Sequence, residues 1–422
     1  MDTTPPTPDE GVLAVIDQPR DPYAALRSRD FRLLFIGRFI WQLGEQMVTI
    51  AVGWELYDRT GSALALGLVG LVQVLPVIAL ALPAGHIADR FNRKGISIIT
   101  MVMLALCSLG LALLSATQGP LALFYLILFV IGISRAFGDP AMSAMLPMTV
   151  SPEHFQSAAT WNSSSWQLAA MLGPALGGFL IGSVFKAEAP VYLLNLFGCS
   201  VFIIMLLLIR GRKIALSTEA MTVQSLMAGV HFIRNTPVIF GAVTLDMFAV
   251  LFGGAVALLP VYAKDVLHVG PEGLGWLRAA PSIGAMLMAL TIATLPPFKQ
   301  AGKTLLWAVL GFGIATIIFG ISQSFYLSLA MLALLGALDN ISVVIRSTLL
   351  LTRPPDEMRG RISAVNSVFI STSNELGGFE SGLAASVLGP VGAVVSGGIG
   401  TILVVLAVMQ YFPELRDLKK LL

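Results

Sequence analysis

The chain alternates between long apolar runs and short polar segments, and this pattern predicts twelve membrane-spanning helices. A helix needs roughly 20 apolar residues to cross about 30 Å of hydrocarbon, and each run reaches that length. The first six predicted spans are 33–57, 63–87, 95–116, 121–147, 156–183 and 189–209. The second six are 237–262, 272–296, 302–321, 325–351, 360–388 and 390–412. We therefore expect an all-α membrane protein.

The longest break between runs, over residues 210–236, separates the spans into two groups of six. Apolar residues alternate there with polar ones, as in an amphipathic helix that lies on the membrane surface; they are Leu226, Val230, Phe232 and Ile233. The predicted parts are an amino-terminal segment (1–32), a six-helix half (33–209), a linker (210–236), a second six-helix half (237–412) and a tail (413–422).

The composition supports a polytopic membrane protein and argues against other classes. Hydrophobic residues make up 56% of the chain and charged residues 12%, whereas soluble domains hold about 45–50% and about 25%. The net charge is only +2, and the basic residues lie at span ends instead of forming a patch, so we expect no nucleic-acid binding. The two cysteines, Cys107 and Cys199, fall in separate apolar runs and are predicted to be core residues. The first 30 residues lack a hydrophobic signal region, so no cleaved leader is expected.

The positions of Lys and Arg predict the orientation of the spans. Most of the 26 basic residues lie in the two termini, the linker and the loops after spans two, eight and ten. The predicted external loops contain only Arg59, Lys186 and Lys264. Because cytoplasmic loops are enriched in Lys and Arg, we expect both termini and the linker to be cytoplasmic.

A charged motif closes the second predicted span. It reads Gly85-His86-Ile87-Ala88-Asp89-Arg90-Phe91-Asn92-Arg93-Lys94. Gly85 is expected to let another backbone approach closely, as small residues do at helix contacts in lipid. The order Gly-x-x-x-Asp-Arg-x-x-Arg-Lys resembles the signature between helices 2 and 3 of the major facilitator superfamily, secondary transporters of twelve helices. Asn92 departs from that signature, which usually has Gly there. The alternative is an ordinary basic loop.

Further stretches resemble one branch of this superfamily, and the likeness covers nearly the whole chain. Span five contains Gly173-Pro174-Ala175-Leu176-Gly177-Gly178, which resembles the fifth-helix signature of proton-driven exporters. The same residues also suit a glycine-lined helix contact with a proline kink. The stretches 58–62 and 373–383 resemble the bacterial enterobactin exporter-like branch. The resemblance implies the major facilitator fold, with two six-helix halves that expose a central site alternately, in a bacterial inner membrane.

Charged residues within the spans are the candidates for transport, because burying a charge in a bilayer is costly. Span one places a polar stripe on one helix face, beside Trp41; it consists of Arg38, Gln42, Glu45 and Thr49. A closed, dry cavity disfavours a charged carboxylate, and opening to water lets its proton leave. We therefore predict that Glu45 carries the coupling proton. The alternative is a permanent ion pair with Arg38 or Arg135.

Other spans contribute further candidates. Asp246 and Asp339 are predicted as alternative proton carriers. Polar groups at similar depth are predicted to line the substrate cavity with span one, or to join helices through hydrogen bonds; they are Gln73, Arg135, Asn340 and Asn374. We expect Asp139 to pair with Arg90 or Arg93 as a conformational latch. The predicted conformational switch comprises Gly85, Asp89, Arg90, Arg93, Lys94 and Asp139.

These features favour a proton-coupled exporter of a siderophore-like or drug-like molecule, rather than an enzyme. The stretch 301–304 imitates the end of a phosphate-binding loop, but Pro297 occupies the required Gly position, so we expect no ATP site. We also expect no cofactor and no metal. Two alternatives are a permease for metabolite uptake or facilitated diffusion, and a non-transporting sensor or assembly factor. The expected partners of a monomer are the substrate, protons and the lipid bilayer.

Overall fold

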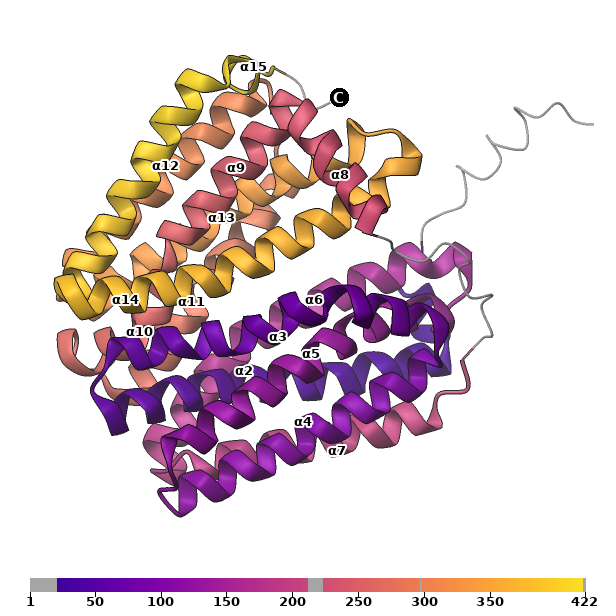
Figure 1. Ribbon diagram of the computed structural model, residues 1–422, viewed down its shortest axis with the longest axis vertical. Helices are drawn as coiled ribbons and strands as arrows, with labels where there is room; N and C mark the ends of the chain where they lie inside the picture. The colour runs from indigo at the N-terminus through magenta and orange to yellow at the C-terminus, as the bar shows by residue number, and fades with distance from the viewer. Residues whose placement is uncertain (1–20, 212–222, 297, 420–422) are drawn as a thin grey trace, which may run out of the picture.

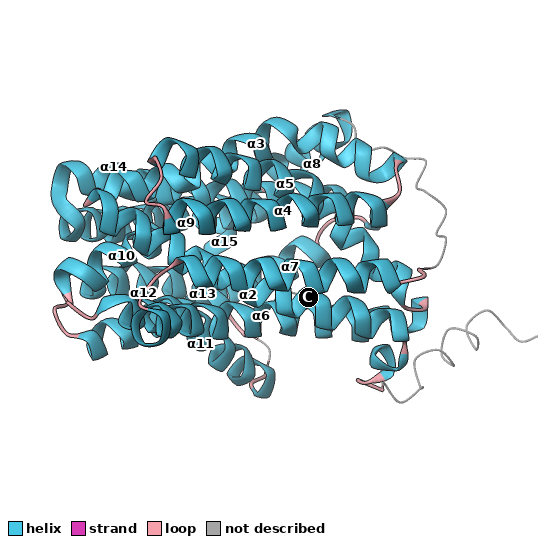
Figure 2. Ribbon diagram, turned by 90° about the horizontal axis from the view of Figure 1, so that it is seen from below, coloured by secondary structure: helices cyan, strands magenta, loops and turns pink. Residues whose placement is uncertain are grey.

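The computed structural model describes residues 21–211, 223–296 and 298–419, and all its regular elements are helices (Figure 2). Ten segments of these residues are long and apolar enough to cross a membrane. One of them, Met358–Tyr411, holds two helices that meet at Gly389. The helix α2 (Arg29–Thr60) has a similar length but carries the polar stripe, which lowers its hydropathy. Together these segments make twelve spans, as predicted.

Six long helices form the amino-terminal half (Figure 1). They are α2, α3 (Ala63–Arg90), α4 (Arg93–Ala116), α5 (Leu121–Thr149), α6 (Phe155–Phe179) and α7 (Ala189–Leu208). Short elements accompany them: η1 (Ala24–Arg27), η2 (Pro152–His154) and η3 (Leu180–Phe185). The helix α2 packs along α6 and α7, while α4 packs along α5 and α7. Cys107 and Cys199 are both buried in this half, as predicted.

The carboxy-terminal half is built from the remaining long helices. They are α9 (Pro237–Phe252), α11 (Gly270–Thr294), α12 (Ala301–Ile321), α13 (Phe325–Thr352) and α14 (Asp356–Tyr411), followed by the short α15 (Pro413–Arg416). The predicted span 237–262 is not one helix, because α9 ends at Phe252. Three short elements follow, namely η4 (Gly254–Leu258), α10 (Leu259–Val261) and η5 (Tyr262–Val266). Glycine is needed at Gly254 because α14 approaches closely there, and an added Cβ would lie 2.5 Å from the Gly377 carbonyl oxygen.

Local signals explain where helices begin and end. The Ser28 hydroxyl accepts a hydrogen bond from the N–H of Phe31 and caps α2. The side chain of Asn92 accepts hydrogen bonds from the N–H groups of Lys94 and Gly95 and caps α4. The residue that departs from the superfamily signature therefore starts the next helix. Gly61 ends α2 with a φ of 60°, a left-handed conformation that favours glycine.

The linker contains the predicted helix, α8 (Val223–Asn235), which packs against α14 and α9 (Figure 1). Val230, Phe232 and Ile233 belong to one hydrophobic cluster with Ile362 of α14. Residues 212–222 and the side chain of Leu226 lie outside the described part of the chain. At the start of α12, Ala301 and Gly302 donate backbone hydrogen bonds to the carbonyls of Lys419 and Leu418.

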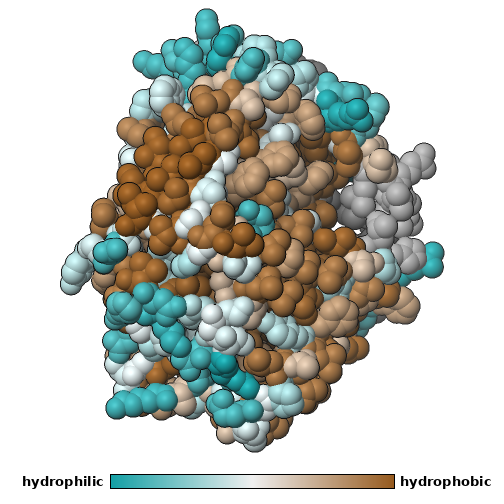
Figure 3. All heavy atoms as spheres, turned by 60° about the vertical axis from the view of Figure 1, so that its left-hand side comes forward, coloured by the Kyte–Doolittle hydropathy of each residue, from teal (hydrophilic) through white to brown (hydrophobic). Residues whose placement is uncertain are grey.

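The outer surface of the helices is apolar, as contact with lipid requires. Ile99, Leu106 and Leu113 of α4 repeat every seven residues and are 62%, 62% and 58% exposed. Residues seven apart lie on the same helix face. Figure 3 shows broad hydrophobic areas between hydrophilic clusters at the top and the lower left.

The two halves touch at two glycine contacts. A Cβ added at Gly178 of α6 would lie 2.9 Å from the Cα of Gly275 in α11. A Cβ added at Gly382 of α14 would lie 2.7 Å from the Cα of Gly67 in α3. Both contacts lie toward the end that the basic residues predict to be external, here called the external end. Helices that lack side chains at these points can approach backbone to backbone.

Candidate functional site

A cavity of about 630 Å³ is lined by both halves of the molecule. Every long helix contributes to its wall, as does the broken segment after α9. Most of the lining is apolar, with aromatic surface from Trp41, Trp166 and Phe312. Its charged residues are Glu45, Arg135, Arg278, Asp339 and Glu375. An apolar pocket with a few converging polar groups is the usual form of a small-molecule site.

Glu45 forms an ion pair with Arg135 in this cavity. The guanidinium donates to Oε1 of Glu45 from Nη2 at 2.7 Å and from Nε at 3.2 Å. Its Nη1 donates to Oε1 of Gln73 at 2.9 Å. Helices α2, α3 and α5 are thus joined at one point. The ion pair predicted as the alternative role of Glu45 is present in this conformation.

The polar stripe of α2 divides between the cavity and the packing of helices. Trp41 and Thr49 line the cavity with Glu45, whereas Arg38 and Gln42 do not, contrary to our prediction. Gln42 is buried and accepts a hydrogen bond from the Ser165 hydroxyl at 3.4 Å, because α6 packs against that part of α2. The Nε of Arg38 has no hydrogen-bond partner among the described residues.

The candidates of the second half also separate into two groups. Asp339 and Asn374 line the cavity. Within the described residues, the Asp339 side chain has neither an ion pair nor a hydrogen bond. Asp246 lies outside the lining, in a buried ion pair with Arg346. Asn340 is also outside the lining, and its Oδ1 has no partner in the part of the chain that the structure describes.

Sequence reasoning did not select two charged residues of the cavity, Arg278 and Glu375. Nη1 of Arg278 donates to the Val256 carbonyl at 3.3 Å. Glu375 lines the same cavity as Arg278 and Arg135, so it shares a poorly hydrated space with both positive charges. Both residues lie inside predicted spans, so the rule that selected Glu45 and Asp339 applies to them equally.

The predicted switch is only partly assembled in this conformation. Among the described atoms, none lies within 4 Å of a Cβ added at Gly85, so the expected close approach is not seen in this conformation. The two glycine contacts between the halves lie at the external end, away from Gly85. Among the described residues no ion pair joins Asp139 to Arg90 or Arg93, and the latch stays a prediction. The Asp89 side chain lies outside the described part of the structure.

Lys94 has a contact that the sequence did not predict. Its Nζ donates to the carbonyl oxygens of Leu207 and Ile209 at 2.9 and 2.7 Å. These carbonyls end α7, where a positive charge is favourable. Lys94 therefore joins the start of α4 to the end of α7.

The fifth-helix signature packs α6 against two neighbours. A Cβ at Gly173 would lie 3.0 Å from the Leu43 carbonyl oxygen, and one at Gly177 would lie 3.0 Å from the Cα of Met47. Both contacts are with α2 in the same half, while Gly178 meets Gly275 in the other half. Pro174 lies inside α6 and its carbonyl oxygen approaches Gly275. These contacts support the interpretation of the signature as a glycine-lined helix contact.

The transmembrane secretion effector family of the major facilitator superfamily has a model that matches residues 20–420. The chain belongs to this family. It is similar to the enterobactin exporter EntS of Citrobacter koseri, at 26% identity over 391 residues, which cover 92% of this chain and 93% of that protein. The enterobactin exporter EntS of Escherichia coli (strain K12) is 25% identical over 391 residues, which again cover 92% of this chain and 93% of that protein. This secretion effector family member is therefore a multi-pass membrane transporter, not an enzyme.

Solved structures with low sequence identity share the fold of this transporter. The nucleoside transporter NupG superposes with a TM-score of 0.71 at 11% identity, covering 90% of this chain and 98% of that one. An inward-facing bacterial homologue of the human lysosomal transporter Spinster superposes with a TM-score of 0.68 at 14% identity, and the match covers 94% of this chain and 99% of that one. These likenesses, with the family match, establish the major facilitator fold predicted from the sequence.

Polar contacts between the halves gather at the external end of the transporter. Nζ of Lys264 lies 2.7 Å from Oδ1 of Asp58, and Tyr57 donates to Asp265 beside it. The hydroxyl of Ser183 donates to Glu272. With the two glycine contacts, these bonds join the two halves at this end of the molecule.

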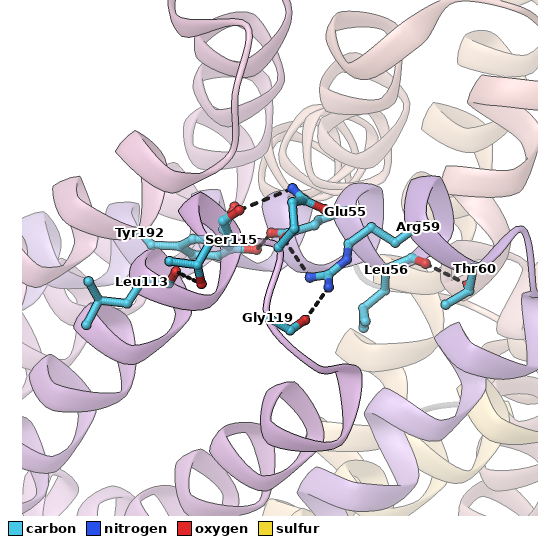
Figure 4. Close-up of polar contacts among 10 residues, drawn as sticks. Glu55, Leu56, Arg59, Thr60, Leu113, Ser115, Gly119 and Tyr192 are labelled. Atoms are coloured by element: carbon cyan, nitrogen blue, oxygen red, sulfur yellow. Dashed lines mark hydrogen bonds and ion pairs between the residues drawn. The ribbon is translucent and has the colours of Figure 1, made fainter.

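A second network lies at the same end within the amino-terminal half (Figure 4). Nη1 of Arg59 lies 3.2 Å from Oε1 of the buried Glu55, and the Tyr192 hydroxyl donates to Oε2 at 2.9 Å. Arg59 also donates to the Gly119 carbonyl and lies over the Phe124 ring. The network joins α2 and α7 to the loop after α4. Arg59, predicted from charge as a loop residue, thus holds three elements together.

Proposed function

We propose that this transporter exports a small molecule across a bacterial inner membrane in exchange for protons. The observation that carries the proposal is the charge of the cavity, where three carboxylates face two guanidinium groups. With every group ionised, one negative charge has no counter-charge. A closed cavity disfavours such a charge, so binding one proton makes the lining neutral. The similarity to enterobactin exporters supports export as the direction.

The contacts favour Asp339 over Glu45 as the carboxylate that exchanges the proton. Arg135 donates two hydrogen bonds to Glu45, and a proton on Glu45 would break this pair. Asp339 has no such partner among the described residues, so protonation breaks no contact there. Glu45 is then the residue that orients Arg135. Asp246 is a weaker candidate, since Arg346 neutralises it outside the cavity.

In the proposed cycle, the two halves rock about the cavity. Asp339 takes up a proton when the cavity faces the acidic outer side and releases it when the cavity faces the cytoplasm. Substrate then binds from the cytoplasm and leaves when the halves open the external end. A proton shifts the conformational equilibrium only through its different affinity for the two conformations.

Transport by purified protein in proteoliposomes tests this function, with enterobactin as the probe because the curated relatives are enterobactin exporters. We expect uphill movement of enterobactin in the parent protein only when a pH gradient is imposed. Asp339→Asn should abolish uphill movement and retain exchange, while Glu45→Gln should impair both. The matched control is Glu380→Gln, a carboxylate of α14 outside the cavity lining.

The same measurement separates the alternatives. Enterobactin flux that ignores the pH gradient in the parent protein would contradict proton coupling and favour facilitated diffusion. If Asp339→Asn still pumps uphill while Glu45→Gln does not, the coupling proton belongs to Glu45.

A further inference from the structure

Glu375 belongs to the carboxy-terminal half, yet its side chain lies against the amino-terminal half. A Cβ added at Gly70 of α3 would lie 2.8 Å from Oε2 of Glu375 and 2.9 Å from its backbone oxygen. These distances are shorter than real Cβ contacts allow, so only glycine leaves room here. Gly70 therefore leaves the space in which the Glu375 carboxylate packs against the opposite half.

Two guanidinium groups line the same cavity as this carboxylate, one from each half. Arg135 comes from α5 and Arg278 from α11, and opposite charges that share a poorly hydrated cavity attract one another. Arg135 also binds Glu45 of α2. The four charges alternate in sign across the boundary between the halves, in the order Glu45, Arg135, Glu375 and Arg278. We call these four residues the charge row.

Among the described residues of the cavity wall, Glu375 has no further group of opposite charge. The neighbouring helix α3 contributes the uncharged Gln73 to the cavity wall, and Gln73 is already bonded to Arg135. The last ionisable residue of the lining is Asp339 of α13, which is also an acid. Attraction between Glu375 and the amino-terminal half therefore comes from Arg135.

We infer that Glu375 is a positioning residue that holds the two halves together in the conformation closed at the external end. The contact at Gly70 lies one helical turn from the glycine contact of Gly67 with Gly382, so the two must separate together when that end opens. Separation moves Glu375 away from Arg135 and leaves Arg135 to Glu45 alone. The attraction is present in only one conformation, and it therefore biases the equilibrium toward that conformation. This inference rests on the proposed function, since it assigns the charge row to the transport cycle.

Labelling of a single cysteine from the external side tests the inference without substrate or pH gradient. The parent for this experiment is a Cys107→Ala, Cys199→Ala protein in proteoliposomes, with Val256→Cys in the cavity wall as the reporter. In it, Glu375→Gln should raise the rate of labelling by a membrane-impermeant maleimide roughly fivefold or more. Gly70→Ala should raise it as well, because the added methyl group would meet both the carboxylate and the backbone oxygen of Glu375 and push α14 away from α3. Glu375→Asp should recover part of the parental rate.

Glu380→Gln is the matched control, since Glu380 is a carboxylate of the same helix outside the charge row, and its labelling should equal that of the parent. Each variant is first compared with the parent by size-exclusion chromatography and thermal melting, so that a folding defect is recognised. Unchanged labelling of Glu375→Gln or of Gly70→Ala in a folded protein would overturn the inference, as would an equal change in Glu380→Gln. The proposed function is decided separately, by the pH dependence of flux in the parent protein.

Discussion

Replacing Gly275 by Ala is expected to open the cavity toward the external end. A Cβ at this position would lie 3.1 Å from the Cα of Gly178 and 3.3 Å from the Cα of Ala175. Both are backbone atoms of α6, which cannot rotate away as the end of a side chain can. The added methyl group therefore forces α6 and α11 apart, in the one conformation in which they touch.

The size of this effect follows from the contact. Adding a methylene-sized group to a tightly packed contact costs about 1–3 kcal/mol. Alanine also favours a helix over glycine by about 1 kcal/mol, but the proposed rocking moves α11 as a rigid helix, so this gain cancels. A free-energy difference of about 1.4 kcal/mol changes an equilibrium constant tenfold. The cost of about 1–3 kcal/mol should therefore lower the ratio of closed to open molecules by about 5- to 150-fold.

The maleimide assay described for Glu375 measures this shift. Gly275→Ala should increase labelling of the cavity cysteine from the external side and decrease it from the cytoplasmic side. Gly360→Ala is the control, because it makes the same change of residue inside α14, where no described atom lies within 4 Å of the new Cβ. Labelling of Gly275→Ala that matches both the parent and Gly360→Ala would refute the role of this contact.

Two more predictions concern stability and orientation. Arg346→Met should lower the melting temperature, because it leaves the buried Asp246 without its partner at a cost of about 3–5 kcal/mol. The double variant with Asp246→Asn should recover most of the loss. If the single variant melts like the parent, the ion pair does not stabilise the protein. A reporter that is active only outside the cytoplasm should stay silent when fused after Leu422, since basic residues concentrate in the predicted cytoplasmic segments; activity there would reverse the predicted orientation.

Hydropathy predicted the helices well wherever a run is uniformly apolar. Span nine, predicted over 302–321, is the helix Ala301–Ile321. The break after Phe252 escaped prediction because residues 253–261 are as apolar as the helix before them, so the hydropathy does not change where the helix ends. The polar residues of α2 show the opposite limit, since they lower its hydropathy although the helix lies among the other spans.

The site was predictable in its residue types but not in its pairs. Charge within a span identified Glu45, Asp339 and Arg135 as candidates, because the bilayer makes such residues costly. Which carboxylate meets which guanidinium depends on how helices far apart in sequence pack. Glu45 and Arg135 are 90 positions apart. Arg278 also lies within a predicted span but was not chosen as a candidate. Only the structure shows that it lines the same cavity as Glu375.

The last two spans meet at Gly389 with no loop between them. Its φ of 75° and ψ of 165° lie where glycine is strongly favoured, and the helix resumes at once with Pro390. A connection of one residue leaves the first helix no freedom to settle in lipid while the second is still being synthesised. We therefore expect the last two spans to enter the membrane together as a pair, and among the described residues their junction, at the end predicted to be external, contains no loop.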